Sequence, residues 1–438
     1  MRIELPISKS IANRLLILQA IHGDGLAGSP TVLASWGALM PVSATLPDDV
    51  QILHRALTTL HNASNSSQSE RPIGGTPSYS PSGRPIAAQA ASCSSIELGN
   101  CGTAMRFLTA YCAQLSGQTT ILDGVERMHH RPIGQLVDAL REIGAQIDYL
   151  GEEGFPPLRI TGKALDKSKP ITLNTPQSTQ FISALLLIGA NVQTDSTSPY
   201  ITLTREIIDQ YPIAHRASNS PHCGRPIAAQ AASSLEKDWS SAAFWYEYVA
   251  LHGGEITLPG LSRDSLQGDK VVADIFAHLG VHTEYTEEGI TITKNENDEF
   301  LIQQPKQLYP TTLRGNQHPA APGAKANNPC RSRELIRAEV VDIVVDNTLS
   351  LDFGNCPDLY PAVALTCERL GITLHAIGVE SLPLKESDRL RAVAEHRTDA
   401  DHRMAMALLI AGYEVDDTAC ISKSYPQFLQ QWQTILNS

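Results

Sequence analysis

Two stretches of the chain, one in each half, repeat the same order of elements: an apolar strand, a helix, a glycine and two further strands. In the first half, GQTTILDGV (residues 117–125) precedes RPIGQLVDALREIGAQIDYL (131–150). In the second half, GGEITLPGL (253–261) precedes GDKVVADIFAHLGVHTEYTEEGITIT (268–293). Strands that alternate with helices in this way pack in α/β layers. The order therefore predicts an α/β protein built from repeated units.

The helix of the second stretch is predicted from its apolar spacing. Val271, Ile275 and Leu279 recur every four positions and so fall on one helical stripe. Gly280 follows the last of them, and a glycine at that place commonly ends a helix. The pattern predicts a helix that buries this stripe and ends near residue 280.

The composition is that of a globular protein of more than one domain. The chain has 438 residues, of which 42% are hydrophobic and 18% charged, and domains usually hold about 100 to 200 residues. The net charge of −12 argues against a general binder of nucleic acid or of an anionic membrane. An anionic ligand would have to be bound by a local cluster of Lys and Arg.

The cysteines and the first residues favour a cytoplasmic protein. The eight cysteines are scattered, without a Cys-x-x-Cys pair or a zinc-site spacing, which is typical of reduced thiols. The opening MRIELPISKS lacks the basic-then-apolar pattern of a signal peptide. No uninterrupted apolar run approaches the roughly 20 residues of a membrane span. We expect a soluble cytoplasmic chain that acts as a monomer.

Stretches rich in Ser, Pro, Gly and Ala interrupt the α/β order. Residues 62–95 and 214–234 carry no apolar period, and both contain the decapeptide GRPIAAQAAS, at 83–92 and at 224–233. One decapeptide in two different contexts is better explained by inserted sequence than by a folded repeat. We expect both stretches to form exposed loops, because lengthening a surface loop costs little free energy.

Two further stretches look like insertions. GNQHPAAPGAKANNPCRSRE (315–334) has the same loop-like composition, and GSPTVLASWGALMPVSATL (28–46) is also irregular. We expect them to lie outside the folded core.

Lys9, Ser10 and Arg14 stand close together in SKSIANR, just before the helical run LLILQAIHG. A hydroxyl and two cations at a helix N-terminus suit an anion. The alternative is a capping serine with solvent-facing basic residues, and the segment alone does not decide between them.

Asn100, Gly102 and Thr103 form a predicted turn into a helix, in LGNCGTAMRFL. Because Gly102 has no Cβ, backbone N–H groups there can approach a ligand closely. Arg127 and Arg131 precede a second helix, predicted to begin near Pro132. The adjacent His129 and His130 could indicate a metal, but neighbouring side chains point in different directions, so we favour surface histidines.

The segment KESDRLR carries four charged side chains within five positions: Lys385, Glu386, Asp388 and Arg389. They could pair on a solvated helix start, since Lys385 and Asp388 lie three apart, as do Glu386 and Arg389. They could also bind an anion and move its protons.

Three other segments of the C-terminal half suggest the same chemistry. Asp358 in NCPDLYPAVAL could be no more than an N-cap. Arg403, at the start of a predicted helix, would oppose the helix dipole unless an anion lay nearby. Lys423 adds a further cation in SKSYPQF.

The order of the segments carries a resemblance that no single segment does. The chain reads SKSxxNR, GNxGTAMR, ERMxxRPIGxLVDAL, STQF, DWSSA, CPDLYPA, KESDRL and DHRMAMA in turn. In this order it closely resembles the EPSP synthase (3-phosphoshikimate 1-carboxyvinyltransferase) family of enolpyruvyl transferases, over nearly the whole chain apart from the insertions. The resemblance implies the shikimate-pathway reaction of aromatic amino-acid biosynthesis.

The resemblance also implies a two-lobed fold, in which each lobe holds three βαβαββ units around a pseudo-threefold axis. Lobe I is predicted to comprise residues 1–8 and 237–438, on the phosphoenolpyruvate and acid–base side. Lobe II is predicted to comprise residues 9–236, on the shikimate 3-phosphate side. The KESDRLR segment would then form one wall of a cleft between the lobes that binds two anions.

Substrate contacts follow from the resemblance residue by residue. Ser10 and Arg14 would bind the carboxylate of shikimate 3-phosphate, and Gln180 would lie against its ring. Its phosphate would be held by Ser178, Thr179, Lys385 and a strand start at Thr197 to Tyr200. The residues implied for shikimate 3-phosphate are Lys9, Ser10, Arg14, Ser178, Thr179, Gln180, Thr197, Tyr200, Asp358, Ser381 and Lys385.

For phosphoenolpyruvate, the resemblance implies that Lys9, Gly102, Arg127 and Lys423 face the phosphate. Arg389 and Arg403 would bind the carboxylate, which a planar guanidinium matches with two parallel hydrogen bonds. The residues implied for phosphoenolpyruvate are Lys9, Asn100, Gly102, Arg127, Gln180, Arg389, Arg403 and Lys423.

The implied catalytic residues are Asp358, Glu386 and Lys9. Asp358 would take the proton of the 5-hydroxyl, Glu386 would deliver and later remove a methyl proton, and Lys9 would stabilise the developing charge. No metal and no organic cofactor is expected. The rival activities are transfer to a UDP-sugar, or a non-catalytic relative that only binds anions.

Two positions bear on ligand contacts. Ser381 stands where the family often has an Asn, so one hydrogen bond to substrate is in doubt. Gly102 is retained, which leaves room for a phosphonate analogue of phosphoenolpyruvate. The resemblance therefore predicts inhibition by glyphosate.

Overall fold

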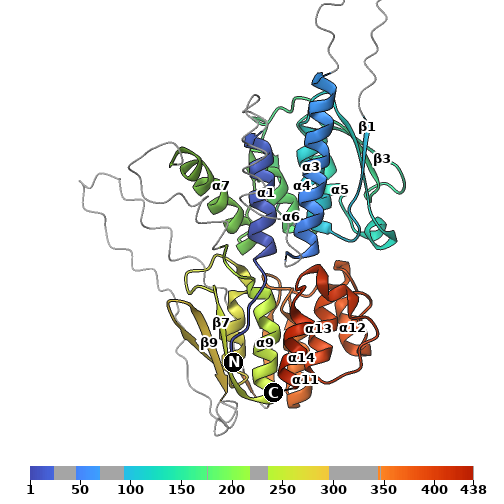
Figure 1. Cartoon of the computed structure of the whole chain (residues 1–438). Helices are drawn as coiled ribbons and strands as arrows, with labels where there is room; N and C mark the ends of the chain where they lie inside the picture. Colours follow the sequence, from blue (N-terminus) through green and yellow to red (C-terminus); the bar gives the residue numbers. More distant parts are fainter. Residues whose placement is uncertain are drawn as a thin grey trace, which may run out of the picture.

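The structure is a computed structural model, and it describes residues 1–23, 46–69, 93–174, 176–217, 235–294, 344–345 and 347–437. Its helices and strands form two groups, one above the other in Figure 1. We keep the name lobe II for the upper group, from α1 to α7, and lobe I for the lower group, from α9 to α14 together with the N-terminal residues. Both groups mix helices with sheets, as the sequence predicts for an α/β protein.

Lobe II contains one complete βαβαββ unit. Its strands pair in the order β1-β2-β4-β3, with β1 parallel to β2, and β4 antiparallel to both β2 and β3. The predicted strand–helix–strand order of residues 117–150 is confirmed here. The elements are β1 (Cys93–Glu97), α4 (Gly102–Ala113), β2 (Thr119–Asp123), α5 (Gly134–Glu142), β3 (Gln146–Tyr149) and β4 (Leu158–Thr161).

The remaining elements of lobe II pack around this unit, and α1, α3, α4 and α6 stand side by side in Figure 1. Strands β5 and β6 form a two-stranded parallel sheet. The elements are α1 (Lys9–Gly23), α3 (Asp48–Ser69), the 3-10 helix η2 (Glu126–His130), β5 (Ile171–Thr172), α6 (Thr179–Leu187), β6 (Val192–Gln193) and α7 (Pro199–Ala217).

Lobe I repeats the pattern with its first strand position filled by the chain's own N-terminus. Arg2 pairs in parallel with Thr257 of β7, and the Ile3 N–H donates to the Thr257 carbonyl at 3.0 Å. The sheet order is β7-β9-β8, antiparallel throughout. The elements are α9 (Trp239–His252), β7 (Gly254–Pro259), η3 (Gly268–Val271), α10 (Val272–Ala277), β8 (His282–Tyr285) and β9 (Gly289–Lys294).

The C-terminal part of lobe I holds a further sheet and the helices that carry the charged motifs. Strand β11 lies between β10, which is antiparallel to it, and β12, which is parallel. The elements are β10 (Val344–Val345), β11 (Thr348–Asp352), α11 (Tyr360–Leu370), β12 (Thr373–Ile377), η6 (Leu382–Leu384), α12 (Arg389–Glu395), α13 (His402–Ile410), η7 (Ala419–Lys423) and α14 (Phe428–Leu436).

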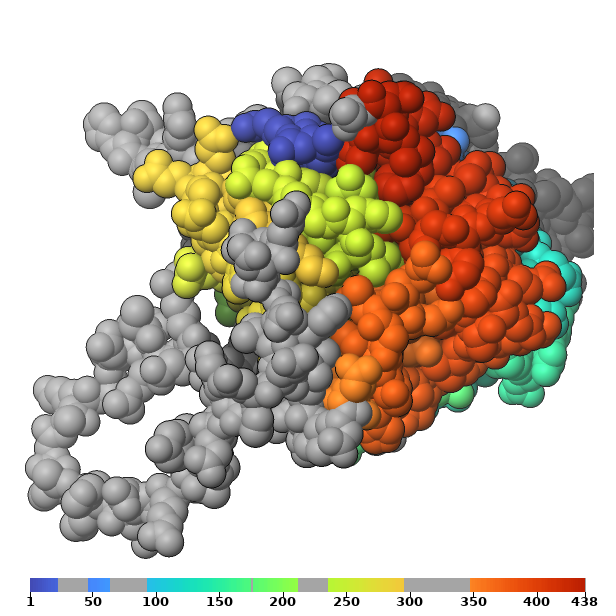
Figure 2. All heavy atoms as spheres, turned by 90° about the horizontal axis from the view of Figure 1, so that it is seen from below, coloured from blue at the N-terminus to red at the C-terminus, as the bar shows by residue number. Residues whose placement is uncertain are grey.

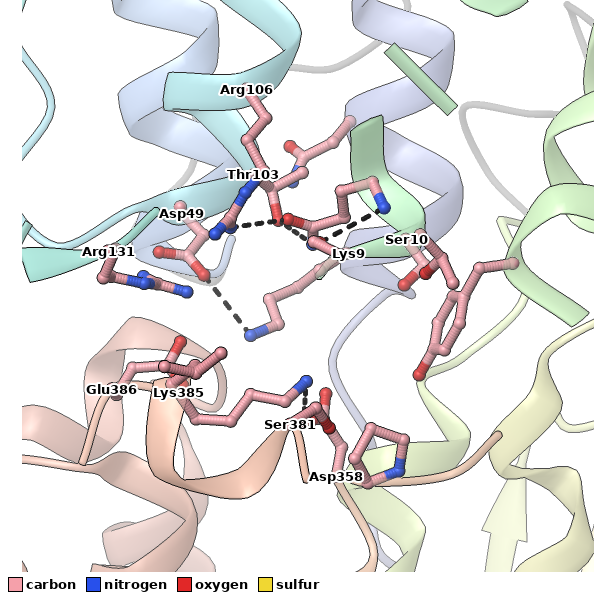
Figure 3. Close-up of a pocket in the computed structure, with 18 of the residues that line it drawn as sticks. Lys9, Ser10, Asp49, Thr103, Arg106, Arg131, Asp358, Ser381, Lys385 and Glu386 are labelled. Atoms are coloured by element: carbon pink, nitrogen blue, oxygen red, sulfur yellow. Dashed lines mark hydrogen bonds and ion pairs between the residues drawn. The ribbon is translucent and has the colours of Figure 1, made fainter. Parts of the chain in front are cut away.

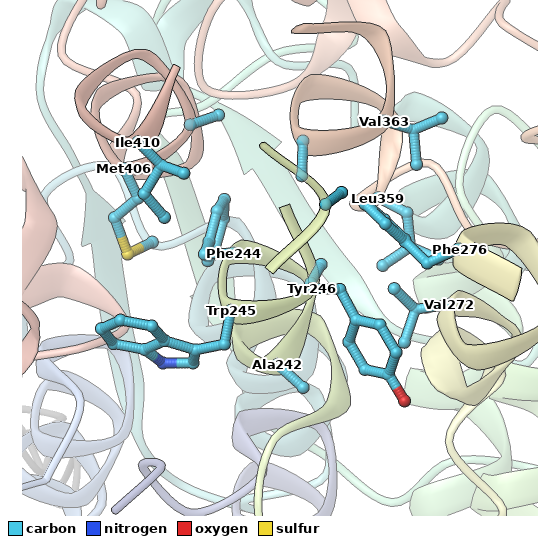
Figure 4. Close-up of a cluster of buried hydrophobic side chains, with 14 of the residues drawn as sticks. Ala242, Phe244, Trp245, Tyr246, Val272, Phe276, Leu359, Val363, Met406 and Ile410 are labelled. Atoms are coloured by element: carbon cyan, nitrogen blue, oxygen red, sulfur yellow. The ribbon is translucent and has the colours of Figure 1, made fainter. Parts of the chain in front are cut away.

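Each lobe has its own hydrophobic core. The core of lobe I surrounds α9, whose Phe244, Trp245 and Tyr246 are fully buried between neighbouring helices (Figure 4). Ile3 and Leu5 belong to this core, and Figure 2 shows the N-terminal residues between the surfaces of residues 239–294 and of the C-terminal helices. The core of lobe II is built from residues between 12 and 207. These two cores support the predicted lobe boundaries, which remain our proposal.

The predicted stripe of Val271, Ile275 and Leu279 is buried, as expected. The segment is one turn of 3-10 helix followed by α10, and Gly280 has a φ of +84° just beyond it. The positive φ fits a glycine at a helix end, because other residues adopt that conformation at a cost.

The predicted loop at residues 62–95 was too wide at both ends. Helix α3 continues to Ser69 and β1 begins at Cys93. Ser and Asn are only a few tenths of a kcal/mol below average as helix formers, so a helix that is already formed can extend through them. Residues 70–92 lie outside the described part of the chain.

The other predicted insertions fall mostly on residues that the structure does not describe. Residues 315–334 lie outside it entirely, and of residues 28–46 only Leu46 is described. In the stretch 214–234, helix α7 continues to Ala217, so the loop prediction was wrong for these four residues. Residues 218–234 lie outside the described part.

The prediction of a strand start at Thr197 to Tyr200 is wrong, because α7 begins there. Pro199 occupies the first helical position, which its fixed φ favours. The Ser198 carbonyl accepts from the N–H groups of Ile201 and Thr202 at 3.0 and 3.3 Å. Helix α1 also begins earlier than predicted, at Lys9, so Lys9, Ser10 and Arg14 belong to its first turns.

Candidate active site

A cavity of about 240 Å³ lies between the two lobes. Most of its lining side chains are polar or charged, and they come from both lobes, as Figure 3 shows. Lobe II contributes Lys9, Ser10, Asn13, Arg14, Asp49, Gly102, Thr103, Arg106, Arg131, Pro132, Pro176, Gln177, Ser178, Thr179, Gln180 and Tyr200, and lobe I contributes Asp238, Ser240, Gly354, Pro357, Asp358, Ser381, Leu384, Lys385, Glu386 and Arg403.

The start of α1 places two cations on the lobe II wall. Lys9 Nζ lies 3.4 Å from Asp49 Oδ2, at the start of α3. Arg14 is buried, and it donates to Thr204 Oγ1 at 2.7 Å and to Ser183 Oγ at 3.1 Å. Burial lowers the pKa of Arg14 to about 10, so the guanidinium is still charged at neutral pH.

Two more guanidinium groups lie beside Gly102 at the start of α4. A Cβ built on Gly102 would lie 2.5 Å from Arg131 Nη2 and 2.6 Å from Arg106 Nη1. Arg106 donates to Gln180 Oε1 at 2.9 Å, and Arg131 donates to the Asn100 carbonyl at 3.1 Å. Burial, followed by the nearby charge of Arg131, lowers the pKa of Arg106 to about 9. Two cations so close to each other favour an anion between or beside them.

The lobe I wall is organised around the carboxylate of Asp358. Asp358 Oδ1 lies 2.7 Å from Arg389 Nη1 and 3.5 Å from Lys385 Nζ, and Oδ2 lies 2.8 Å from Arg403 Nη2. Burial opposes ionisation of Asp358, but Arg403, Lys385 and Arg389 together outweigh it and hold the pKa well below its usual value. Asp358 is therefore an ionised carboxylate that can accept a proton.

Glu386 is the second carboxylate of this wall. Its Oε1 lies 3.1 Å from Lys423 Nζ, and its Oε2 lies 3.1 Å from Arg389 Nη2. Burial again opposes ionisation, but Lys423, Arg131 and Arg389 hold the pKa of Glu386 well below its usual value. Glu386 is not the surface residue of a solvated helix start, which was the alternative for this segment.

Arg389 and Arg403 differ in how many of their guanidinium nitrogens have hydrogen-bond partners. Arg389 is buried, and its three nitrogens contact the carboxylates of Asp358, Glu386 and Asp401. Arg403 faces the cavity, and among the described residues its Nε and Nη1 have no hydrogen-bond partner. Of these two guanidinium groups, Arg403 is thus the one that lines the cavity and is less fully paired with carboxylates.

Arg127 crosses from lobe II to the backbone of lobe I. It donates to the carbonyl oxygens of Pro383, Lys385 and Glu386 at 3.1 to 3.2 Å. Lys423 makes the reverse connection, from lobe I to the Asn100 carbonyl at 3.1 Å. These contacts join the segment that bears Lys385 and Glu386 to the opposite wall.

Comparison with known proteins gives the relationship of this chain to others. The model of the EPSP synthase (3-phosphoshikimate 1-carboxyvinyltransferase) family matches residues 44–326 and 393–432. The 3-phosphoshikimate 1-carboxyvinyltransferase of Bacteroides fragilis is 32% identical over 480 residues, covering 97% of this chain and 93% of that protein. The chain belongs to the EPSP synthase family. The enzyme of that name from Ralstonia nicotianae is 30% identical, with 97% of this chain and 94% of that protein covered.

The fold agrees with that of a solved EPSP synthase. The structure of EPSP synthase from Acinetobacter baumannii superposes with a TM-score of 0.52 at 17% sequence identity, covering 99% of this chain and 95% of that chain. At this identity the likeness concerns the fold alone. The predicted fold, that of the enolpyruvyl transferases, is confirmed.

Most residues predicted from the family resemblance lie together at the cavity, and five do not line it. Thr197, Asn100 and Arg127 are set back, and Arg389 and Lys423 contact the carboxylates from behind. The predicted residues that line the cavity are Lys9, Ser10, Arg14, Gly102, Ser178, Thr179, Gln180, Tyr200, Asp358, Ser381, Lys385, Glu386 and Arg403.

Sequence reasoning missed Asp49 and Arg106 as lining residues, and it named Arg131 beside Arg127 without giving it a role. Arg106 follows Gly102 by four positions, so the helical period places both on the same face of α4. That spacing was a usable signal. Asp49 had none, because it lies in the first turn of α3, where acidic residues are ordinary.

Several alternatives for single residues can now be decided. Asp358 is not an N-cap, since α11 begins at Tyr360 with Leu359 as its cap. Arg403 lies in the first turn of α13, as predicted, and Asp401 caps that helix. His129 Nε2 lies 2.8 Å from Asp123 Oδ1. In the described ranges, no group of three or more His, Cys, Asp or Glu residues is arranged to hold a metal ion.

Two further findings concern the described residues. The six described cysteines, Cys93, Cys101, Cys112, Cys356, Cys367 and Cys420, are free; Cys223 and Cys330 lie outside that part of the chain. None of the described helices is long and apolar enough to cross a membrane.

Proposed function

We propose that this chain transfers the enolpyruvyl group of phosphoenolpyruvate to the 5-hydroxyl of shikimate 3-phosphate and releases inorganic phosphate. The observation that carries the proposal is the pair of carboxylates, Asp358 and Glu386, which line the cavity and are each in contact with cations. A site that only bound anions would gain nothing from two carboxylates beside them. An addition followed by an elimination moves protons at two places, so a site that catalyses it needs two proton-transferring groups.

Shikimate 3-phosphate lies against the wall formed by α1, α6 and the start of α7. Ser10 and Arg14 bind its carboxylate, Ser178 and Thr179 bind its phosphate with Lys385, and Gln180 lies against the ring. Ser178 and Thr179 are at the N-terminus of α6, where backbone N–H groups and the helix dipole favour a phosphate. Thr197 is exposed and does not line the cavity, so no substrate contact is assigned to it.

Phosphoenolpyruvate lies between the start of α4 and the Lys385–Glu386 segment. Its phosphate faces Lys9 and Gly102, together with the guanidinium groups of Arg106 and Arg131 beside Gly102. Its carboxylate is bound by Arg403. Arg403 lines the cavity on this side, which supports the placement. Arg389 is already occupied by carboxylates, so it acts by orienting Asp358 and Glu386.

The addition step joins the two substrates. The 5-hydroxyl oxygen bonds to C2 of phosphoenolpyruvate while Asp358 takes the hydroxyl proton and Glu386 delivers a proton to C3. The product is a tetrahedral ketal phosphate with a methyl group. Lys9, which is placed between the two substrates, stabilises the charge that develops.

The elimination step regenerates the double bond. Glu386 removes a proton from the methyl group, the C2–O bond to phosphate breaks, and inorganic phosphate leaves. Glu386 therefore has to be protonated before the addition and ionised before the elimination. The phosphate of bound phosphoenolpyruvate opposes the charges of Lys423 and Arg131, which raises the pKa of Glu386 and favours its protonation when substrate is present.

The active unit is one chain acting in the cytoplasm. Both walls of the cavity come from the same chain, so a second copy is not needed to complete the site. The free thiols of the described cysteines fit a reducing compartment.

The test is phosphate release by the purified chain with phosphoenolpyruvate and one of two acceptors. Release with shikimate 3-phosphate but not with UDP-N-acetylglucosamine is expected. Release only with the UDP-sugar would assign the chain to the rival transferase. No release with either acceptor, from a folded chain that binds both anions, would identify a non-catalytic relative.

A further inference from the structure

The turn formed by Gln267, Gly268 and Asp269, which we call the seam turn, lies where the two lobes meet. The chain passes between the lobes near Ile7 and again near Lys237, and these two residues form an antiparallel bridge. The Ser8 N–H donates to the Glu236 carbonyl at 3.0 Å. The two crossings are therefore one paired unit, against which the seam turn packs.

Gln267 contacts both crossings with one side chain. Its Oε1 accepts from Ser8 Oγ at 2.8 Å and from the Trp239 N–H at 3.3 Å, and its Nε2 donates to the Lys237 carbonyl at 2.8 Å. The side chain is buried. A buried amide with all these partners fixes the position of the turn relative to both crossings.

Gly268 packs against lobe II. A Cβ on this residue would lie 3.0 Å from Pro199 Cβ and 3.2 Å from the Asn355 carbonyl oxygen. Pro199 is the first residue of α7. The absence of a side chain at position 268 thus lets the start of α7 approach the seam turn.

Asp269 contacts the cavity wall from behind, on both sides of the seam. Its Oδ2 accepts a hydrogen bond from Ser240 Oγ of lobe I, and its Oδ1 lies 3.4 Å from the hydroxyl of Tyr200 in lobe II. Tyr200 and Ser240 both line the cavity, whereas Asp269 is 3% exposed and does not line it. Neither the sequence nor the family resemblance drew attention to this carboxylate.

Asp269 is suited to accept from two hydroxyl groups. Burial, followed by the nearby charge of Asp358, raises the pKa of Asp269 to about 6. At the pH of the cytoplasm it is therefore mostly ionised, and an ionised carboxylate accepts hydrogen bonds but donates none. Tyr200, in turn, is tied to the anion-binding wall, because its carbonyl accepts from Arg14 Nη2 at 3.2 Å.

We propose that Asp269 is a positioning residue, which holds the Tyr200 hydroxyl across the seam and so completes the shikimate 3-phosphate wall when the lobes are together. Asp269 touches neither substrate. It acts through Tyr200 and Ser240. The hydrogen bonds of Gln267 fix the position of Asp269 relative to the two crossings. The inference rests on the proposed function, since it assigns Tyr200 to the shikimate 3-phosphate wall.

The test compares Asp269→Asn, Tyr200→Phe and the double variant, with Asp264→Asn as the matched control. Asp264 is exposed and lies in the same loop. Steady-state kinetics gives KM for each substrate and kcat, and calorimetry gives the Kd of shikimate 3-phosphate. Thermal unfolding of each variant reports whether it folds.

Asp269→Asn and Tyr200→Phe are each expected to raise KM and Kd for shikimate 3-phosphate about tenfold, as for the loss of a hydrogen bond to a charged group. KM for phosphoenolpyruvate and kcat should change little. The double variant should be no worse than either single variant, because both remove the same interaction. Asp264→Asn should behave as the unaltered chain.

Three results would overturn the inference while the proposed function stands. These are an unchanged KM for shikimate 3-phosphate in Asp269→Asn, additive effects in the double variant, or an equal loss in kcat and both KM values that points to a merely structural role. If Asp269→Asn does not fold, Asp269→Glu, which keeps the carboxylate but moves it, takes its place with the same expected result. An unaltered chain that neither binds nor turns over shikimate 3-phosphate would contradict both the proposed function and this inference.

Discussion

Lys423 Nζ lies 3.1 Å from Glu386 Oε1 and 3.1 Å from the carbonyl oxygen of Asn100. Lys423 and Glu386 belong to lobe I, and Asn100 belongs to the turn that precedes α4 in lobe II. The ammonium group of Lys423 thus connects Glu386, the proposed acid–base residue, to the turn before α4, where phosphoenolpyruvate is proposed to bind. Any anion that binds at this turn changes the electrostatic potential at Glu386.

Replacement of Glu386 by Gln should remove proton transfer at C3 and leave both substrates able to bind. We expect kcat to fall by at least about 100-fold, the usual contribution of a positioned acid or base, with smaller changes in both KM values. Steady-state phosphate release measures this. Glu380→Gln, at an exposed position six residues earlier, should keep full activity; a similar loss there would show that the loop and not the carboxylate is affected.

Replacement of Gly102 by Ala should weaken the binding of phosphoenolpyruvate and of glyphosate. The added Cβ would lie within 2.6 Å of the guanidinium groups of Arg106 and Arg131, and both would have to move. We expect KM for phosphoenolpyruvate and the inhibition constant of glyphosate to rise about tenfold or more, which corresponds to about 1.4 kcal/mol. Equal sensitivity of both enzymes to glyphosate would overturn this steric explanation.

Replacement of Arg403 by Lys should impair the binding of the phosphoenolpyruvate carboxylate. Lys offers one ammonium group in place of a planar fork and cannot reproduce two parallel hydrogen bonds. KM for phosphoenolpyruvate should rise about tenfold, and KM for shikimate 3-phosphate should change much less. Arg397→Lys, on the exposed surface, is the control and should match the unaltered chain. A larger effect on shikimate 3-phosphate would assign Arg403 to the other substrate.

Glu247 is expected to destabilise lobe I at neutral pH. It is fully buried in α9, and among the described residues its two carboxylate oxygens have no hydrogen-bond partner. Burial raises its pKa well above the usual value. Because the pKa in the folded state is higher than in the unfolded state, the cost is small near pH 4.5 and grows as the pH rises above that.

Glu247→Gln should therefore raise the free energy of unfolding by about 1 to 3 kcal/mol at pH 8, with a smaller gain at pH 5. Thermal or denaturant unfolding at both pH values measures the difference. Glu284→Gln, on an exposed position of β8, should leave stability unchanged at both. A gain for Glu247→Gln that did not depend on pH would contradict the assignment of the effect to ionisation.

The parts of the fold that depend on local pattern could be predicted from the sequence. The buried stripe of Val271, Ile275 and Leu279 and the strand–helix order of residues 117–150 follow from apolar spacing. The start of α7 could not be predicted in the same way. Ser198 and Pro199 fit a helix start or a turn equally well, and the sequence does not reveal that Pro199 lies close to Gly268 of the other lobe.

The site was predictable where a motif carries it, and less so where distant residues meet. Lys9, Asp358 and Lys385 were named from motifs and line one cavity. Asp269 was not named, because its partners Tyr200 and Ser240 are 69 and 29 residues away. Nothing in the sequence around Asp269 indicates that they meet.

The most direct test of the proposed chemistry is to run the reaction with shikimate 3-phosphate and phosphoenolpyruvate in D₂O and to analyse the product by mass spectrometry. Addition followed by elimination forms a methyl group with a hydrogen taken from solvent through Glu386. Loss of any one of its three hydrogens leaves deuterium in part of the product. We predict deuterium in the enolpyruvyl methylene of the product. A product formed at full yield without deuterium would contradict the addition–elimination account.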